Sequence, residues 1–387
     1  MTESADVVIV GGGPVGAALG LALEPSGLNV LALEARGEGA QAPPEAAARP
    51  LALSYGSRLI LERLGVWEAL AGVTPIERIH VSQAGGYGRV VLDARAAGLD
   101  AYGYVVDYGR LDAALSGAAR ERMPGYRPRA RVTAVHPGAA HALVEYVRDG
   151  VECTVEAALA AVADGGASVA SARMKTRDYR QSAVTARVRT ELPHRHTAYE
   201  RFTRDGPLAL LPMGADMAVV WTMSPERAAE LAAAPAEAFL QALQAQFGER
   251  LGLFRDVRGR TVHPLALRFA AEATLQHTIL IGNAAQSLHP VAGQGFNLGL
   301  RDAWELATEI ADCEPEWLGQ AAMLAAAGRR RRLDRRAAVT FTDMLVRVFS
   351  NDLPPLRMAR GAALAVLDSV PPLKAFLARR MTFGARG

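Results

Sequence analysis

The sequence has few lysines and few cysteines. Lys175 and Lys374 are the only lysines among the 43 basic residues of this 387-residue chain, so nearly all of its cations are arginines. The two cysteines, Cys153 and Cys313, lie far apart with no second pair nearby. This usage argues against a disulfide framework or a cysteine-built metal site, and we expect no metal. A reducing cytoplasm fits best.

Long apolar runs are also missing. Glu24 and Asp368 interrupt the longest candidates before they reach the roughly 18 residues that a membrane-spanning helix needs. Because 50% of the residues are hydrophobic and only 21% are charged, the chain is too apolar for a disordered polyelectrolyte. Its length predicts two or more lobes. Asp6 leads the first apolar run without a cationic leader, so we expect no secretion signal there.

The first motif is a strand, a glycine turn and a helix. Residues 6–10 are typical of a buried parallel strand, and residues 17–23 continue as a helix. Between them lie Gly11, Gly12, Gly13, Pro14, Val15 and Gly16. Gly11 would permit the tight turn, Gly13 would let the backbone reach a pyrophosphate, and Gly16 would let the helix pack on the strand. Glycine triplets also occur in ordinary loops, but this order predicts dinucleotide binding.

An acidic residue supports that interpretation. A second strand over residues 29–33 ends at Glu34, 23 residues after the first glycine. A carboxylate at this point can accept hydrogen bonds from a ribose. Ala35 and Arg36 follow it directly and belong to the same predicted cofactor contact.

A second glycine-rich loop lies much further along the chain. Residues 278–281 form another buried-strand run, residues 282–299 contain four glycines, and helical periodicity resumes over residues 300–310. Such a loop can cradle an anion or a ring with its backbone N–H groups. The alternative, a connection that only packs tightly, does not explain why His289, Gln294 and Asn297 lie within it.

These motifs together resemble the class A flavoprotein aromatic hydroxylases. The resemblance implies that the first motif binds the ADP half of FAD and that the second wraps its ribityl chain and isoalloxazine. It assigns cofactor contacts in the second motif to Asn283, Ala284, Pro290, Gly293, Gln294, Gly295, Phe296 and Asn297. Asn283 stands where the family usually has an aspartate, and an amide can both accept and donate there.

Longer matches resemble one branch, the UbiH-type hydroxylases of ubiquinone biosynthesis. They occur in the same order as in that branch, over residues 199–203, 206–213, 263–267, 282–290 and 293–299. The similarity runs from about residue 5 to the C-terminal tail.

Four further positions match the family less specifically. Asp164 and Gly165 follow a strand over residues 158–163 and resemble a segment that contacts FAD, although by composition they form a simple turn. Arg49 and Arg110 match positions that lie against FAD, and each is otherwise an ordinary surface arginine.

The motif positions predict an α/β fold with a discontinuous Rossmann-like FAD-binding domain. We expect this domain to combine residues 1–75, 100–172 and 275–328. Alternating patterns in the intervening region predict an antiparallel β-sheet substrate domain over residues 76–99 and 173–274, interrupted by a helical interval over residues 225–247. Residues 329–387 would form a C-terminal helical, basic tail. Substrate would bind between the sheet and the FAD-binding domain.

The resemblance also implies the chemistry. NAD(P)H would reduce FAD, O₂ would add to the reduced flavin, and the C4a-hydroperoxide would hydroxylate an aromatic ring. The implied reaction converts 2-polyprenyl-6-methoxyphenol to 2-polyprenyl-6-methoxy-1,4-benzoquinol. His289 could assist deprotonation of the phenol, or it could be a structural histidine. Other functions stay open: a sister hydroxylase acting at another ring carbon, an FAD-dependent reductase of a prenylated substrate, or a non-catalytic subunit that binds flavin or presents lipid.

Charge is unevenly distributed along the chain. From Arg329 onward there are 13 basic and four acidic residues, whereas residues 1–328 carry 30 basic and 36 acidic ones. The tail could face anionic lipid at the inner face of the cytoplasmic membrane or an acidic protein of a biosynthetic complex. Alternatively, it packs on its own domain or on a second copy of the chain. The arginine run over residues 329–336 lacks interleaved aromatics, so nucleic acid is not expected as a partner.

Overall fold

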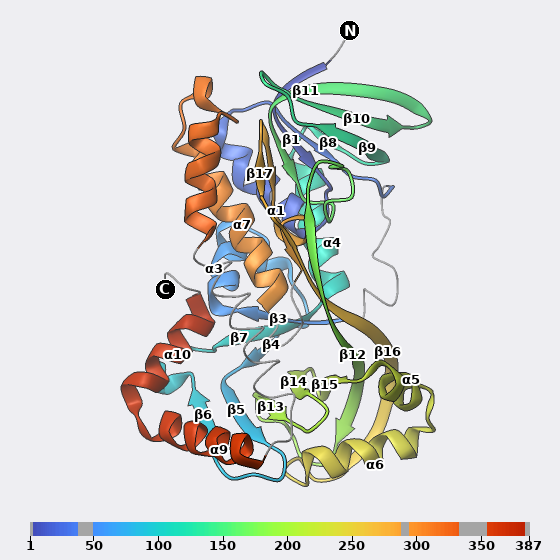
Figure 1. The fold of residues 1–387 in the computed structure, drawn as a ribbon, viewed down its shortest axis with the longest axis vertical. Coiled ribbons are helices and arrows are strands. Elements are labelled where there is room, and N and C mark those ends of the chain that lie inside the picture. Colours follow the sequence, from blue (N-terminus) through green and yellow to red (C-terminus); the bar gives the residue numbers. More distant parts are fainter. Residues whose placement is uncertain (1–2, 38–48, 288–293, 333–353, 384–387) are drawn as a thin grey trace.

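Two long paired strands connect an upper and a lower lobe of the chain (Figure 1). The computed structural model describes residues 3–37, 49–287, 294–332 and 354–383. The connecting strands, β12 (Met174–Thr190) and β16 (Phe254–Ala270), pair antiparallel along most of their length. The upper part is called the nucleotide lobe below, and the lower part is called the roof lobe.

A largely parallel sheet organises the nucleotide lobe. Its main path runs β17-β18-β11-β1-β2-β8, and β10 and β9 extend from β11 as an antiparallel layer. The strands are β1 (Glu3–Val10), β2 (Val30–Leu33), β8 (Tyr126–Arg127), β9 (Ala130–His136), β10 (Ala142–Arg148), β11 (Val151–Val162), β17 (Thr274–Leu275) and β18 (Thr278–Leu280). Strands β2, β1, β11 and β18 lie parallel to their neighbours, so their carboxyl ends meet at one edge.

Strand β1 is apolar on both faces because it is covered on both. Val7 and Ile9 pack in a core with three helices, whereas Val8 and Val10 pack in a second core with β9 and β10. The helices are α1 (Pro14–Leu23), α4 (Tyr108–Arg122) and α7 (Gln294–Ala311). The predicted strand, glycine turn and helix are confirmed.

A three-stranded sheet lies beside these helices. It contains β3 (Pro50–Ser54), β7 (Gly103–Asp107) and β4 (Thr74–Ile76), in the order β3-β7-β4. Helix α3 (Tyr55–Arg63) starts directly after β3, where the Ser54 side chain accepts a hydrogen bond from the Ser57 N–H. Such an N-cap stabilises the first turn of a helix.

The roof lobe is built on one large sheet with the order β19-β16-β12-β15-β14-β13-β5-β6. Its remaining strands are β5 (Arg78–Gln83), β6 (Arg89–Asp93), β13 (Thr197–Phe202), β14 (Pro207–Met213), β15 (Asp216–Met223) and β19 (Gln286–Ser287). Side chains alternate between its two faces, as the sequence pattern predicted. Leu208 and Leu210 face one side, while Leu211 and Met213 face the small sheet on the other.

Two helices cover the first of these faces (Figure 1). They are α5 (Pro225–Ala233) and α6 (Ala236–Phe247), and Phe239 and Leu243 of α6 are fully buried against the sheet. The sequence pattern predicted a single helical interval here. The chain breaks it before Pro235, whose ring disfavours helical geometry in the preceding residue.

The C-terminal part of the chain is helical where it is described. Helix 321–332 follows α7, while α9 (Pro354–Ser369) and α10 (Pro371–Phe383) contribute Leu364 and Ala378 to a small core with β6. No single helix in the described part is long and apolar enough to cross a membrane. The segments Met358–Ser369 and Pro371–Arg380 meet the length and composition test only as a pair bent by 95°.

Short 3-10 helices complete the fold: η1 (Glu24–Ser26), η2 (Trp67–Ala69), η3 (Arg95–Ala97), η4 (Gly282–Ala284) and η6 (Pro315–Trp317). The predicted α/β class is confirmed. The second sheet is antiparallel as predicted, except that β13 pairs parallel with β5. Strand β11 begins seven residues before the predicted strand at residue 158, because its first half pairs with β10 as a hairpin.

Candidate functional site

The turn between β1 and α1 can be formed only by small residues. Gly11 has a φ of +95°, and a Cβ there would lie 3.0 Å from the backbone nitrogen of Asp164. A Cβ on Gly16 would overlap the carbonyl oxygen of Gly11. The two glycines therefore bring the strand, the helix and the end of β11 together.

Gly13 differs from these because its Cβ direction is open. It is the N-cap residue of α1, and a Cβ there would meet no protein atom within 4 Å. Pro14 has no N–H, but Val15 and Gly16 carry first-turn N–H groups that lack acceptors within the helix. An open helix N-terminus of this kind binds phosphate groups. The predicted pyrophosphate cradle thus has both the free space and the donors it needs.

Glu34 lies beside this turn at the end of β2. Its side chain is buried, and Oε1 accepts hydrogen bonds from the backbone N–H and the Nε of Arg36, both at 2.9 Å. Its Oε2 faces Gly12, where a Cβ would lie only 3.0 Å away. The absence of a side chain on Gly12 thus lets the carboxylate approach the glycine turn.

Arg36 connects Glu34 to α4. Its guanidinium donates to both carboxylate oxygens of Asp112, at 2.5 Å and 3.1 Å. The hydrogen bond to Asp112, followed by that to Glu34, raises the pKa of Arg36 above its ordinary value. Arg36 therefore positions Glu34, and the neighbouring Ala35 is exposed. Sequence reasoning did not identify Asp112, which lies 76 residues from Arg36.

The turn after β11 lies at the same sheet edge. The Oδ1 of Asp164 accepts a hydrogen bond from the Gly166 N–H at 2.8 Å, and Gly165 and Gly166 both have positive φ. A Cβ on Gly166 would lie 3.4 Å from the Cα of Ala284 in η4. Asp164 is exposed, so its second oxygen lies toward solvent where a ligand can reach.

The second glycine motif packs directly on the first. A Cβ on Gly282 or on Gly299 would come within 3.2 Å or 3.0 Å of Val15. Asn283 is exposed at this edge and Ala284 is buried. The structure therefore brings both motifs together at the carboxyl ends of β1, β11 and β18, the usual ligand site of an open α/β sheet.

Asp302 on α7 holds the start of the second motif through hydrogen bonds. Its carboxylate accepts hydrogen bonds from the Gly282 N–H at 3.0 Å and from Gln286 Nε2 at 2.6 Å. Arg331 Nε donates to the same carboxylate at 2.5 Å. Asp302 lies about two turns into α7, and no pattern in the sequence marked it as part of the site.

Asn297 uses its side chain to join α7 to β3 and α3. Its Oδ1 accepts from the Ser54 N–H at 2.8 Å and from the Ser57 hydroxyl at 2.7 Å, while Nδ2 donates to the Ala52 carbonyl at 2.8 Å. The backbone N–H of Asn297 lies in the first turn of α7. Gly295 is open on its Cβ side and Phe296 packs on the core.

Arg49 and Arg110 lie near the small sheet. The Arg49 guanidinium is 5.3 Å from the centre of the Tyr108 ring. Arg110 donates to the Ala71 carbonyl at 3.0 Å and lies 3.6 Å from a carboxylate oxygen of Asp107. Their predicted contact with the cofactor stays a prediction. His289, Pro290 and Gly293 lie outside the described residues, and for Gln294 the structure gives only its place in α7.

A small apolar pocket of about 70 Å³ lies between the two lobes. Ile76, Ile79 and Leu92 contribute to its wall, with Asn297 at one side and Ala378 of α10 at another. The pocket therefore connects the Asn297 side of the nucleotide lobe with the inner face of the roof sheet.

Glu200 of β13 belongs to this inner face. Its neighbours Tyr199 and Arg201 face α6, because Tyr199 stacks edge-on against Phe247 and Arg201 donates to the Gln246 carbonyl. Strand alternation puts Glu200 on the opposite side, one pairing step beyond Ala198 and its partner Ile79. Burial raises the pKa of Glu200 to about 7. Glu200 could not be singled out from the sequence, because residues 199–203 matched the family only as a block.

Comparison with known proteins agrees with this geometry. Residues 4–342 match the model of a family described as FAD binding domain. The ubiquinone hydroxylase UbiL of Rhodospirillum rubrum is 35% identical over 97% of this chain and 89% of the relative. The 3-demethoxyubiquinol 3-hydroxylase of Escherichia coli is 31% identical over 96% of this chain and 97% of the relative.

Solved structures show the same fold. The p-nitrophenol 4-monooxygenase PnpA of Pseudomonas putida superposes with a TM-score of 0.75 at 17% identity, and the match covers 100% of both chains. The chain belongs to the FAD-binding-domain family of class A flavin monooxygenases. It is an FAD-dependent oxidoreductase of the monooxygenase type, with NAD(P)H and O₂ as the co-substrates standard for this class.

The cradle fits FAD. Gly13 leaves space at the N-terminus of α1, Glu34 lies beside the glycine turn at the end of β2, and Asp164 and Asn283 are exposed at the same sheet edge. These residues would hold the dinucleotide, with the second motif extending along it toward the lobe interface.

Proposed function

We propose that this chain hydroxylates the aromatic ring of a polyprenyl phenol in ubiquinone biosynthesis, converting 2-polyprenyl-6-methoxyphenol to 2-polyprenyl-6-methoxy-1,4-benzoquinol. The observation that carries the proposal is the apolar pocket between the lobes, beside Asn297 of the second FAD motif. The names of the relatives, ubiquinone hydroxylases, support the substrate class.

When bound, FAD would accept electrons from NAD(P)H and activate O₂. The chain itself contributes orientation and exclusion of water. Ile76, Ile79 and Leu92 give the phenol an apolar environment that excludes competing water. Glu200 lies on the same face of the roof sheet, outside the described lining of this pocket. We propose it as the group that accepts the phenol proton, because burial raises its pKa to about 7 and such a carboxyl is half ionised at neutral pH. The resulting phenolate is more electron-rich and is therefore more readily hydroxylated.

A sister reaction at another ring carbon is the second candidate. It is favoured by the relative named 3-demethoxyubiquinol 3-hydroxylase, which is 31% identical along nearly the whole chain. Both candidates need the same cradle and the same apolar pocket, so they differ in the substituents of the ring and in which ring carbon faces the flavin.

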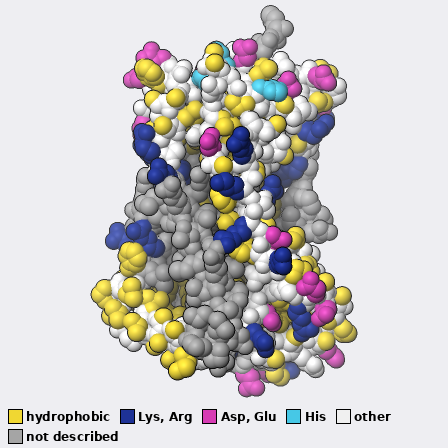
Figure 2. All heavy atoms as spheres, viewed as in Figure 1, with side chains coloured by type: hydrophobic (Ala, Val, Ile, Leu, Met, Phe, Trp, Pro, Cys, Tyr) yellow, Lys and Arg dark blue, Asp and Glu magenta, His cyan; other side chains and the backbone are white. Residues whose placement is uncertain are grey.

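Localisation follows from the substrate. A polyprenyl tail stays in lipid, so the proposal puts the protein at the inner face of the cytoplasmic membrane. Apolar side chains are exposed on the C-terminal helices, at the lower left of the molecule (Figure 2). They include Met358, Val366, Leu373 and Phe376, of which Met358 is 62% exposed.

The test uses the FAD-loaded protein with NAD(P)H and ¹⁸O₂. Each candidate phenol is supplied separately, and products are identified by mass spectrometry. We expect one ¹⁸O atom in the 1,4-benzoquinol made from 2-polyprenyl-6-methoxyphenol. Oxygen incorporation only into a demethoxyubiquinol would favour the sister reaction. NAD(P)H consumption with no labelled product from any phenol would reject both.

A further inference from the structure

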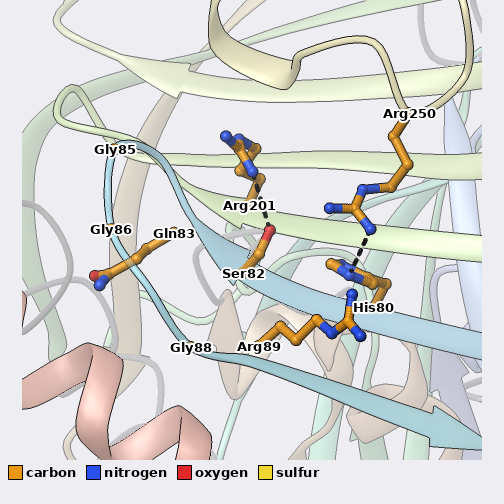
Figure 3. A pocket seen from close by; sticks show the side chains of 9 residues that line it. All are labelled: His80, Ser82, Gln83, Gly85, Gly86, Gly88, Arg89, Arg201 and Arg250. Carbon is orange, nitrogen blue, oxygen red and sulfur yellow. Dashed lines mark hydrogen bonds between the residues drawn. The ribbon is translucent and has the colours of Figure 1, made fainter.

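A second, larger pocket lies on the outer face of the roof sheet. It has a volume of about 450 Å³ and is lined by His80, Ser82, Gln83, Arg89, Arg201 and Arg250, together with the glycine-rich turn between β5 and β6 (Figure 3). His80 and Arg201 lie on the face that packs against Tyr199 and α6. The sheet itself therefore separates this pocket from the apolar pocket beside Asn297.

Three guanidiniums converge in this pocket without a neutralising carboxylate. No Asp or Glu occurs among the described residues that line it. Arg201 donates to the Gln246 carbonyl at 2.7 Å and to the Ser82 hydroxyl at 3.3 Å, and Arg250 donates to His80 Nε2 at 3.1 Å. These partners are all uncharged, so the positive charge of the pocket is not balanced locally.

Asp368 is a carboxylate that acts on the pocket but has other partners. Asp368 of α9 interacts electrostatically with Arg89, but its Oδ1 accepts hydrogen bonds from Lys374 Nζ at 2.6 Å and from the Val91 N–H at 3.1 Å. That lysine adds a cation to the same neighbourhood. Arg89 itself is exposed, with its side chain at the edge of the pocket (Figure 3).

The pKa values of two side chains in the pocket, His80 and Arg201, are lowered. Burial, with Arg250 as the next cause, lowers the pKa of His80 to about 4, so the imidazole is neutral at physiological pH and can accept from Arg250. The same two causes lower the pKa of Arg201. An anion bound among the guanidiniums would relieve this repulsion.

We propose that this pocket binds a phosphate-bearing anion. Guanidiniums donate in pairs to the oxygens of phosphate, and three of them around one opening suit a group with several charged oxygens. Gly85 of the turn has no protein atom within 4 Å of its Cβ position, so this side of the pocket is open to a ligand. The volume also has room for the group that carries the phosphate.

The rim of the pocket connects it to the C-terminal helices. The Tyr87 hydroxyl donates to the Met358 carbonyl at 3.1 Å, and a Cβ on Gly88 would overlap the carbonyl oxygen of Gly361. Tyr87 and Met358 are both more than half exposed. An apolar rim beside a phosphate site suits a phospholipid headgroup, and a soluble phosphate ester is the other source of the same chemistry.

The test uses FAD-loaded protein, so that the pyrophosphate cradle at α1 is already filled. Binding of inorganic diphosphate is measured by isothermal titration at low ionic strength for wild type, for R89Q/R250Q and for R227Q. Arg201 is not substituted, because its hydrogen bond to the Gln246 carbonyl connects the sheet to α6. Arg227 is an exposed arginine of α5 that pairs with Glu230, so R227Q is the matched control. The single variant R89Q, at an exposed side chain, guards against a folding defect.

We expect R89Q/R250Q to weaken diphosphate binding at least tenfold and R227Q to leave it unchanged. In a second arm, the proteins are sedimented with phosphatidylcholine vesicles with or without phosphatidylglycerol. Binding to the anionic vesicles that is lost in R89Q/R250Q identifies a lipid headgroup. Diphosphate binding without vesicle binding identifies a soluble ester. If R89Q/R250Q binds diphosphate and vesicles as well as R227Q does, the proposal is overturned.

Discussion

Arg331 and Asp302 form a nearly buried ion pair that connects the start of the arginine run to the second FAD motif. Arg331 Nε lies 2.5 Å from the Asp302 carboxylate, and the two side chains are only 12% and 6% exposed. Because Asp302 also holds the Gly282 N–H, this pair supports the cofactor loop from a helix that comes later in the chain.

R331Q is therefore expected to lower the free energy of unfolding by about 3 kcal/mol, because it leaves a buried carboxylate without its cation. FAD retention should fall with it, since Gly282 loses its support. Chemical denaturation and flavin absorbance after gel filtration measure the two effects. The control is R329Q in the same run, where the arginine is exposed. Equal stability of R331Q and R329Q would contradict the assigned role.

Gly13 and Gly16 should respond differently to alanine. A Cβ on Gly16 would overlap the Gly11 carbonyl oxygen, so we expect G16A to fold poorly. A Cβ on Gly13 meets no protein atom within 4 Å and its φ is −64°, so G13A should keep wild-type stability within about 0.5 kcal/mol. Its methyl group would occupy the space for the pyrophosphate.

Fluorescence titration of the apoprotein with FAD checks this second expectation. G13A should bind FAD at least tenfold more weakly than wild type although its thermal unfolding is unchanged. Wild-type FAD affinity in G13A would place the pyrophosphate elsewhere.

The raised pKa of Glu200 predicts that the free energy of unfolding depends on pH. Burial raises its pKa from 4.5 to about 7 in the folded state, so the folded protein binds a proton that the unfolded chain has released. The group therefore costs stability progressively as the pH rises from about 4.5 to 7. E200Q should be more stable than wild type at pH 8, by roughly 3 kcal/mol at most, and the difference should close near pH 4.5. Urea denaturation at several pH values measures it, with the exposed Glu272→Gln as control.

The catalytic role proposed for Glu200 has a separate readout. If its carboxylate accepts the phenol proton, kcat/KM of the wild type should rise with pH through about 7. E200Q cannot accept the proton, so this rise should disappear and the plateau rate should fall by about 100-fold or more. A rise that persists unchanged in E200Q would assign the step to another group, such as the predicted His289.

The sequence was sufficient for the parts of the site that depend on local chemistry. The strand, the glycine turn and Glu34 could be predicted, because only glycine tolerates the close contacts at Gly11 and Gly16. Contacts between distant segments could not. Asp112 and Arg36 are 76 residues apart, and no local pattern relates them.

The contacts of the arginine run over residues 329–336 could not be predicted from the sequence either. Its composition indicated a surface that faces lipid or an acidic partner, yet Arg330 pairs with Glu309 and Asp312, and Arg331 pairs with Asp302. These acids lie on or directly after α7, and only the packing of helix 321–332 against them reveals the pairing. Part of the positive charge of the tail is thus neutralised within the chain.

The long strands β12 and β16 also limit how the enzyme can move. The lobes are joined by a hydrogen-bonded ribbon whose pairing shifts register at three points along β12: between Asp178 and Gln181, between Thr185 and Arg187, and between Arg189 and Thr190. A ribbon transmits force along its length and resists shear far better than a flexible linker does. Opening the lobe interface would therefore require bending at these irregular points.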